Sequence, residues 1–237
     1  MKLCHSLLPS LTATLITIQH VNGQPVNDSS GRGVVKQFSQ DIGENAFIYN
    51  GTEYINADPL LKGDPFFLGN ETWNGTLVYN NVAYSNVRLL YDTWNDVVIT
   101  QRYNNGVLMN LISEKIKAFT LGNHSFIRLI KDDNGNASLT TGFYELFYDG
   151  STQVIAKHRK RIDKANTVET GFVESTHYFL RKNGKYFAVK NKRELLRLLH
   201  DKTDVIKKFL KANGLNYKQQ PEETLARVAA LYDQVSK

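Results

Sequence analysis

The sequence is poor in cysteine: its 237 residues contain one, Cys4. Cys4 lies ahead of the N-terminal apolar run and not behind it, an order that does not fit a lipoprotein anchor. A mature chain that starts after this run would have no cysteine, which excludes disulfides, thiolate metal sites and a cysteine nucleophile. Such a domain relies on its hydrophobic core, and this favours a bacterial periplasm or exterior over a small eukaryotic disulfide-rich module.

Long apolar runs are missing as well, since none reaches the roughly 20 residues of a membrane-spanning helix. The run from Leu7 to Ile18 has 12 residues, and Val21 and Gly23 then occupy the −3 and −1 positions of a cut before Gln24. This pattern predicts a secretory signal peptide over residues 1–23, with a buried N-terminal helix or strand as the alternative. We therefore expect an exported protein, periplasmic or extracellular, without a transmembrane span.

The motifs of metal, nucleotide and serine-hydrolase sites are also lacking. The histidines after residue 23 form no HxH or HExxH pattern, and there is no GxSxG, GxGxxG or phosphate-binding glycine loop. The stretch from Asp132 to Asn136 resembles the start of a calcium loop, but Ala137 and Phe143 occupy the positions where that loop needs glycine and glutamate. We expect neither a metal nor a cofactor.

Charge is unevenly distributed along the chain. Residues 24–156 hold 9 Lys and Arg against 14 Asp and Glu, a balance of −5, whereas residues 157–218 hold 17 against 6, a balance of +11. The basic segment 157–218 includes the run His158 to Arg161 and predicts a possible contact with an anionic surface. Export argues against nucleic acid as the partner, and a solvated helix face is the simpler interpretation of the lysines.

Strand-forming residues alternate with turn pairs through much of the chain. In Gly75 to Ile112, the pairs Asn80-Asn81 and Asn105-Gly106 separate runs rich in Val, Ile, Leu and Tyr. Asn and Gly reach the positive φ angles of two-residue hairpin turns at low cost. The pattern predicts a flexible leader over 24–45 and an antiparallel β meander over 46–190. Its first hairpin is expected around Asn50-Gly51.

Several of these strands carry apolar residues on both faces. Val87, Leu89 and Tyr91 share one face of their strand, and Leu90 lies on the other. A sheet of this kind must be covered on both sides, which it achieves by curling or by packing against helices. The fold class we predict is mainly β (α+β), with a curved meander or partly open barrel of about ten strands.

Helical signals replace the strand pattern after Val189. Asn191 followed by Glu194 predicts an N-cap, Asp201 predicts the cap of a second helix, and Asn213-Gly214 predicts its end. Pro221 and the acids after it predict the start of a third helix. We expect three short helices over 191–237, packed on the same domain as the sheet.

Several sequence segments that combine strand and turn residues, in a fixed order, resemble those of a known family. The segments are YNNVAYSNVRLLYDTWNDVVI, GFYELFYDG and YFLRKNGKYFAVKNKRELLRLL, followed by the helical tail. Over residues 46–237 the chain resembles an uncharacterised family of secreted β-rich proteins of Gram-negative bacteria. The resemblance implies envelope localisation and a one-piece fold, and no activity. A curved sheet with helices on its concave side is also similar to periplasmic lipoprotein carriers, an analogy of fold only.

Three functions are consistent with these patterns. The first is a non-enzymatic binding protein for an apolar ligand or an envelope protein or glycan, with Tyr79, Tyr84, Tyr91 and Trp94 as candidate wall residues. The second is a carbohydrate-acting hydrolase that uses the paired carboxylates Asp92 and Asp96, although turn formation and packing explain these residues as well. The third is a structural accessory that docks its basic helices on an anionic envelope surface.

Overall fold

The computed structural model describes residues 47–56, 61–102, 105–131, 139–163 and 170–236. All of them belong to one compact unit, Ser39–Lys237. The predicted signal peptide, the predicted leader and the loop Asp132 to Asn136 lie outside the described residues. No helix in the described part is long and apolar enough to cross a membrane.

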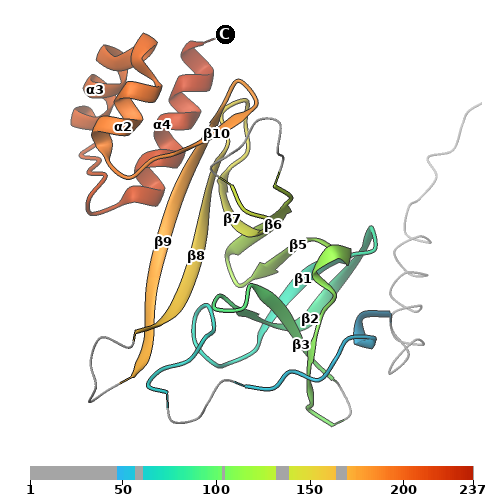
Figure 1. Ribbon diagram of the computed structural model, residues 1–237. Coiled ribbons are helices and arrows are strands. Elements are labelled where there is room, and N and C mark those ends of the chain that lie inside the picture. Colours follow the sequence, from blue (N-terminus) through green and yellow to red (C-terminus); the bar gives the residue numbers. More distant parts are fainter. Residues whose placement is uncertain (1–46, 57–60, 103–104, 132–138, 164–169, 237) are drawn as a thin grey trace, which may run out of the picture. The chain divides into compact units, whose positions relative to one another are not determined.

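Ten antiparallel strands form a single open sheet, which confirms the predicted fold class (Figure 1). Their order across the sheet is β10-β9-β8-β7-β6-β5-β1-β2-β3-β4. The strands are β1 (Trp73–Tyr79), β2 (Val82–Asp92), β3 (Val97–Gln101), β4 (Leu108–Asn110), β5 (Ile116–Leu121), β6 (His124–Leu129), β7 (Gly142–Tyr148), β8 (Val154–Asp163), β9 (Gly171–Lys182) and β10 (Lys185–Ala188).

The order shows two meanders, β1 to β4 and β5 to β10. After β4 the chain crosses back over the first meander, because β5 pairs with β1 and not with β4. Five residues connect β4 to β5, and three of them form the 3-10 turn η3 (Ser113–Lys115). On a flat sheet these strands would lie about 19 Å apart. The connection spans only about 16 Å when one turn of it is 3-10 helix. The sheet must therefore curl.

The curl brings distant strands together. The backbone N–H of Lys160 in β8 donates to the carbonyl of Thr93, just after β2, at 3.3 Å, although β8 and β2 are five places apart in the sheet order. A strap, Leu61–Gly69, crosses the same gap. It exchanges backbone hydrogen bonds with Phe172 at the start of β9 and with Tyr91 at the end of β2, and it buries Phe67 beneath it.

Local turn chemistry sets two of the hairpins. Asn80 and Asn81 have φ angles of 50° and 63°, and Asn183 and Gly184 have 52° and 76°. Both central residues of each turn are thus left-handed, as a type I′ hairpin requires. The predicted turn at Asn80-Asn81 is confirmed, and Asn183-Gly184 forms a turn by the same chemistry.

The hairpin predicted around Asn50-Gly51 does not form, and this expectation was wrong. Phe47–Tyr49 is a 3-10 turn (η2), and the chain then runs along the edge of β4. Tyr54 N–H donates to Leu108 O, and Asn110 N–H donates to Thr52 O, each at 2.8 Å. Pairing with an existing strand edge satisfies these backbone groups better than a short isolated hairpin, which is marginally stable.

Apolar residues fill both faces of the sheet, as the alternation predicted. Val87, Leu89 and Tyr91 belong to one buried cluster, and Leu90 belongs to another on the opposite face. A third cluster joins the sheet to the helices, with Val154, Leu180 and Val189 on the sheet side. Its helical side consists of Leu195, Leu199, Ile206, Leu210, Leu215, Leu225, Val228, Ala229 and Tyr232.

Three helices pack at the β8–β10 end of the sheet (Figure 1): α2 (Lys192–Leu198), α3 (Thr203–Ala212) and α4 (Pro221–Val235). Asn191 caps α2 by accepting a hydrogen bond from Glu194 N–H, as predicted. Asp201 does not cap α3, contrary to the prediction. The 3-10 turn η4 (His200–Lys202) precedes that helix, and Asp201 instead accepts hydrogen bonds from Lys182 and Tyr232.

Candidate functional site

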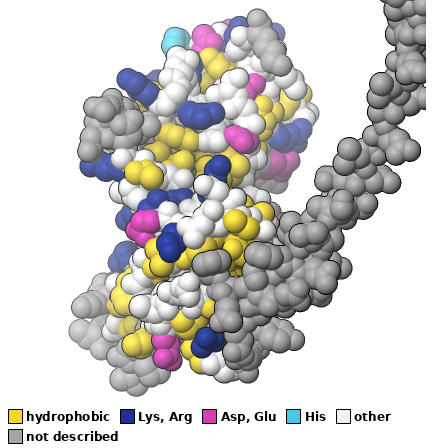
Figure 2. All heavy atoms as spheres, turned by 90° about the vertical axis from the view of Figure 1, so that its right-hand side faces the viewer, with side chains coloured by type: hydrophobic (Ala, Val, Ile, Leu, Met, Phe, Trp, Pro, Cys, Tyr) yellow, Lys and Arg dark blue, Asp and Glu magenta, His cyan; other side chains and the backbone are white. Residues whose placement is uncertain are grey.

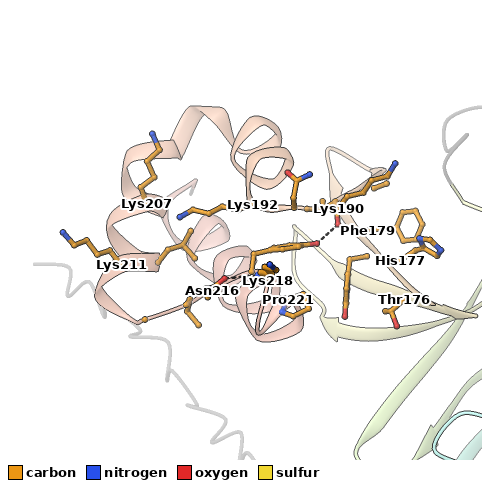
Figure 3. A pocket seen from close by; sticks show the side chains of 18 residues that line it. Thr176, His177, Phe179, Lys190, Lys192, Lys207, Lys211, Asn216, Lys218 and Pro221 are labelled. Atoms are coloured by element: carbon orange, nitrogen blue, oxygen red, sulfur yellow. Dashed lines mark hydrogen bonds between the residues drawn. The ribbon is translucent and has the colours of Figure 1, made fainter. Parts of the chain in front are cut away.

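A hollow lies between the end of the sheet and the helices (Figure 3). Strand β9, the segment after β10, helix α3 and the loop before α4 line it, and its volume is about 1370 Å³. Leu210 and Leu215 are buried in its floor. The Tyr217 hydroxyl donates to Val189 O at 2.6 Å and ties the loop before α4 to the strand end. We call this hollow the basic groove.

Positive charge dominates the lining of the basic groove. Five lysines line it, together with His177, and no Asp or Glu does; the lysines are Lys190, Lys192, Lys207, Lys211 and Lys218. All five are exposed. Figure 3 shows Lys207 and Lys211 on α3, across the groove from Thr176 and His177 of β9. None of the five lysines forms an ion pair with another described residue.

A second hollow, of about 570 Å³, adjoins the basic groove and shares Lys192 and Lys207 with it. We call it the side hollow. Arg193, Arg197 and His200 complete its charged lining, again without a carboxylate. Seven cationic residues therefore surround two adjoining hollows. On the face drawn in Figure 2, by contrast, basic and acidic side chains are interspersed.

Three acids at the helical end of the molecule, Glu194, Asp201 and Glu222, already have partners. The Glu194 carboxylate accepts a hydrogen bond from the backbone N–H of Lys190, which completes the cap of α2. Asp201 binds Lys182 at 2.9 Å, and this pairing lowers the pKa of the Asp201 carboxyl. Glu222 accepts a hydrogen bond from the Tyr178 hydroxyl at 3.0 Å. These carboxylates stabilise the helices and leave the groove lysines without partners.

Burial of Tyr217 below the groove leads to a prediction about pH. Burial raises its pKa to about 12, and the charge of Glu194 adds to the effect. Between pH 10 and 12 the unfolded chain loses a proton that the folded chain keeps, so this group's stabilisation is present below pH 10 and is lost above it. In the unmodified protein, this group lowers the unfolding free energy by up to about 1.4 kcal/mol per pH unit across that window. We expect Tyr217→Phe to lack this part of the fall.

Urea unfolding between pH 8 and 11.5 measures this effect. At pH 8 the variant should be less stable by about 1 kcal/mol, since it lacks the hydrogen bond to Val189. The two stability curves should then converge as the pH rises. Parallel curves would show that the Tyr217 hydroxyl does not titrate in this range.

Asp92 is fully buried at the end of β2, where it organises the turn that follows. One carboxylate oxygen accepts the backbone N–H groups of Trp94 and Asn95, at 2.8 and 2.9 Å. The other accepts the Asn95 side-chain amide at 2.8 Å and the Tyr54 hydroxyl at 2.9 Å. With four donors bound, this carboxylate has the surroundings of a structural turn residue.

Asp96 lies at the far end of the same turn and has different partners. It accepts the Tyr91 hydroxyl at 2.6 Å and pairs with Lys157 at 2.6 Å. Burial lowers the pKa of Lys157, and the nearby Asp96 opposes this shift. The Lys157 ammonium also donates to Phe143 O at 2.9 Å. Asp92 and Asp96 therefore bind different sets of partners, each of them within the folded protein.

The four candidate wall residues differ in their surroundings, and none lines the basic groove or the side hollow. Tyr79 and Tyr91 are fully buried in the aromatic cluster of the curled sheet, and Tyr84 packs partly buried against it. Trp94 is 40 % exposed and packs edge-on against Phe172, with the ring centres 5.6 Å apart. This placement favours packing over a shared ligand wall.

The curled sheet also contains a His–Glu–His cluster that sequence reasoning missed, with Glu145 and His158 buried and His124 partly exposed. Glu145 of β7 bridges His124 and His158, at 2.5 and 2.6 Å. His158 also contacts the Thr176 hydroxyl at 3.1 Å. Phe67 of the strap packs against both imidazole rings. No motif signals this cluster, because its members come from four neighbouring strands and a strap, at positions that are far apart in the sequence.

The basic segment 157–218 is divided by the fold. Lys157 and His158 are buried within the sheet, and Lys160 binds Asp64 of the strap at 3.3 Å. The run His158 to Arg161 therefore does not act as one exposed basic patch. The cations that surround the hollows all come from the C-terminal part of the segment, residues 190–218.

Within the described ranges, no group of three or more His, Cys, Asp and Glu side chains is arranged to hold a metal ion. Comparison with models of protein families, with curated proteins and with solved structures found no match.

Proposed function

We propose that this chain is an exported, non-enzymatic binding protein whose anionic partner occupies the basic groove. The observation that carries the proposal is the set of five exposed lysines that line one hollow with no carboxylate among them and no ion-pair partner in the described part of the chain. Export rests on the predicted signal peptide.

Cations held around a concave surface repel one another, and an anion bound between them removes that repulsion. A hollow lined by one sign of charge also focuses the electric field and raises the local concentration of counter-ions. The apolar floor at Leu210 and Leu215 excludes water beneath the partner. A ligand that combines negative groups with an apolar face fits both features.

The hydrolase alternative draws no support from this geometry. Asp92 is fully buried with four bound donors, and Asp96 is paired with Lys157. Glycoside hydrolysis requires two carboxyl groups that face one cleft, whereas these two bind different sets of partners within the folded protein. Binding without catalysis therefore remains the function that the groove supports best.

Charge reversal in the groove tests the proposal. In the double variant Lys207→Glu and Lys211→Glu, we expect affinity for fluorescein-labelled dextran sulfate to fall about ten- to hundredfold at low salt, since two attractive contacts become repulsive. Fluorescence anisotropy at increasing NaCl concentration measures this, and binding by the unmodified protein should weaken steeply with salt.

The matched control is the double variant Lys115→Glu and Lys117→Glu. These lysines are exposed and lie outside both hollows, so the change in net charge is the same. We expect less than a threefold loss of affinity. Equal losses in the two variants would show that net charge, and not the groove, binds the polyanion.

A further inference from the structure

We infer that the partner is a linear acidic polysaccharide that runs from the basic groove into the side hollow; this inference rests on the proposed function. Lys192 and Lys207 line both hollows, so the two lie side by side with these lysines at their shared boundary. A single small anion would occupy one hollow and leave the cations of the other unpartnered. A chain with repeated negative groups satisfies both.

Each hollow has a like-charged pair at one-turn spacing on its helix. Lys207 and Lys211 on α3 line the basic groove, and Arg193 and Arg197 on α2 line the side hollow. Residues four apart lie about 6 Å apart along a helix axis, and like charges at this spacing destabilise the helix by about 0.2–0.5 kcal/mol. Negative groups bound over both helices would remove this cost in both places.

The shape of the site favours a polysaccharide over a lipid surface. The side hollow is shallow, but the basic groove is deeper, and the flat array of headgroups of a bilayer would not reach the buried Leu210 and Leu215 in it. The oxygens of Asn191 and Asn216 accept backbone N–H groups, which leaves their side-chain NH2 groups as donors for sugar hydroxyls. The apolar side chains of Leu196 and Leu215 lie in the same lining.

The aromatic residues of the site argue against single-stranded nucleic acid, which binds by stacking its bases on exposed rings. Tyr217 is buried and its hydroxyl is bound to Val189 O, and the Tyr178 hydroxyl is bound to Glu222. The side hollow has no aromatic residue in its lining. The side hollow therefore has no stacking platform, and in the basic groove only the half-buried ring of Tyr178 and the exposed imidazole of His177 are available for stacking.

Oligogalacturonates of 2, 4, 8 and 12 sugars test the inference on the full chain, by isothermal titration calorimetry at one fixed low salt concentration. We expect affinity to rise at least tenfold from the dimer to the longest chain. In the double variant Arg193→Gln and Arg197→Gln, the dimer should bind as it does to the unmodified protein, while the gain with length should fall to less than threefold.

Other outcomes separate the two proposals. If affinity did not depend on chain length, or if the double variant kept the full gain in affinity with length, one chain would not occupy both hollows. The basic groove would then remain a site for a single anion. If a 12-nucleotide oligothymidylate or phosphatidylglycerol vesicles bound more tightly than the oligogalacturonate of equal charge, the inference that the partner is a polysaccharide would be wrong. Failure of every anion to bind would overturn the proposed function itself.

Discussion

Gly142→Ala is expected to destabilise the protein by about 3–5 kcal/mol, because an added methyl group would enter the ion pair between the buried Lys157 and the partly buried Asp96. Gly142 has a φ of +152°, and a Cβ at this position would lie 2.0 Å from Asp96 Oδ2 and 2.7 Å from Lys157 Nζ. Backbone strain at such a position costs about 1–3 kcal/mol. Displacing Asp96 from Lys157 adds about 2 kcal/mol, less than the 3–5 kcal/mol of a fully buried pair because the Asp96 side chain is 27 % exposed.

Gly69→Ala is the matched control. Gly69 also has a positive φ, +86°, but a Cβ there would meet nothing within 4 Å. We expect it to lose only the strain energy, about 1–2 kcal/mol. Urea unfolding of both variants at pH 7 measures the difference. If Gly142→Ala lost no more stability than Gly69→Ala, the close approach of Asp96 and Lys157 to this glycine would be wrong.

Glu145→Ala is expected to cost about 3–5 kcal/mol of unfolding free energy. The Glu145 side chain is 5 % exposed, and its two oxygens each bind a histidine nitrogen, of His124 and His158. Hydrogen bonds to a charged group contribute about 1.5–3 kcal/mol each. Alanine would also leave a void beside Phe67, and the buried His158 would lose its main partner.

Glu145→Gln separates the effect of the lost hydrogen bonds from the effect of the lost side-chain volume, because glutamine has nearly the same size as glutamate. Its amide has one oxygen acceptor and one NH2 donor, so it can serve one histidine as an acceptor and the other only if that ring changes tautomer. We expect an intermediate loss of stability. Glu114→Ala is the control, because Glu114 is 75 % exposed and lies 3.9 Å from Arg128; its loss should stay below about 0.5 kcal/mol.

Nitrogen-15 spectra of the imidazole rings supply a second readout of the cluster. In the unmodified protein at neutral pH, a Glu145 carboxylate requires a proton on His124 Nδ1 and on His158 Nε2, the two nitrogens that face it. Glu145→Gln should alter the proton position on at least one ring. Unchanged spectra together with unchanged stability would show that the bridge does not form in solution.

Much of the local structure followed from short-range chemistry. The turns at Asn80-Asn81 and Asn183-Gly184, the cap at Asn191 and the helix start at Pro221 each depend on residues within a few positions of one another. Positive φ, side-chain capping and the missing N–H of proline act over that range, so a sequence displays them directly. The alternation in β2 likewise predicted which side chains are buried together.

The failures share one cause, which is competition from distant parts of the chain. The segment around Asn50-Gly51 has a good hairpin signal but pairs with β4 instead, through Tyr54 and Asn110. Asp201 follows the pattern of a helix cap but binds Lys182 and Tyr232. In both cases a tertiary partner offers better hydrogen bonds than the local alternative.

The sequence by itself determined the class of the fold, the places of its turns and helices, and the concentration of positive charge near the C-terminus. Only the tertiary structure decided which charges are available. It buried Lys157 and His158 in the curled sheet and gathered Lys190, Lys207 and Lys218 around a hollow. The physical reason is that charge is a property of composition, whereas burial and pairing depend on contacts between residues far apart in the chain, and those contacts arise when the sheet curls and the helices pack on its end.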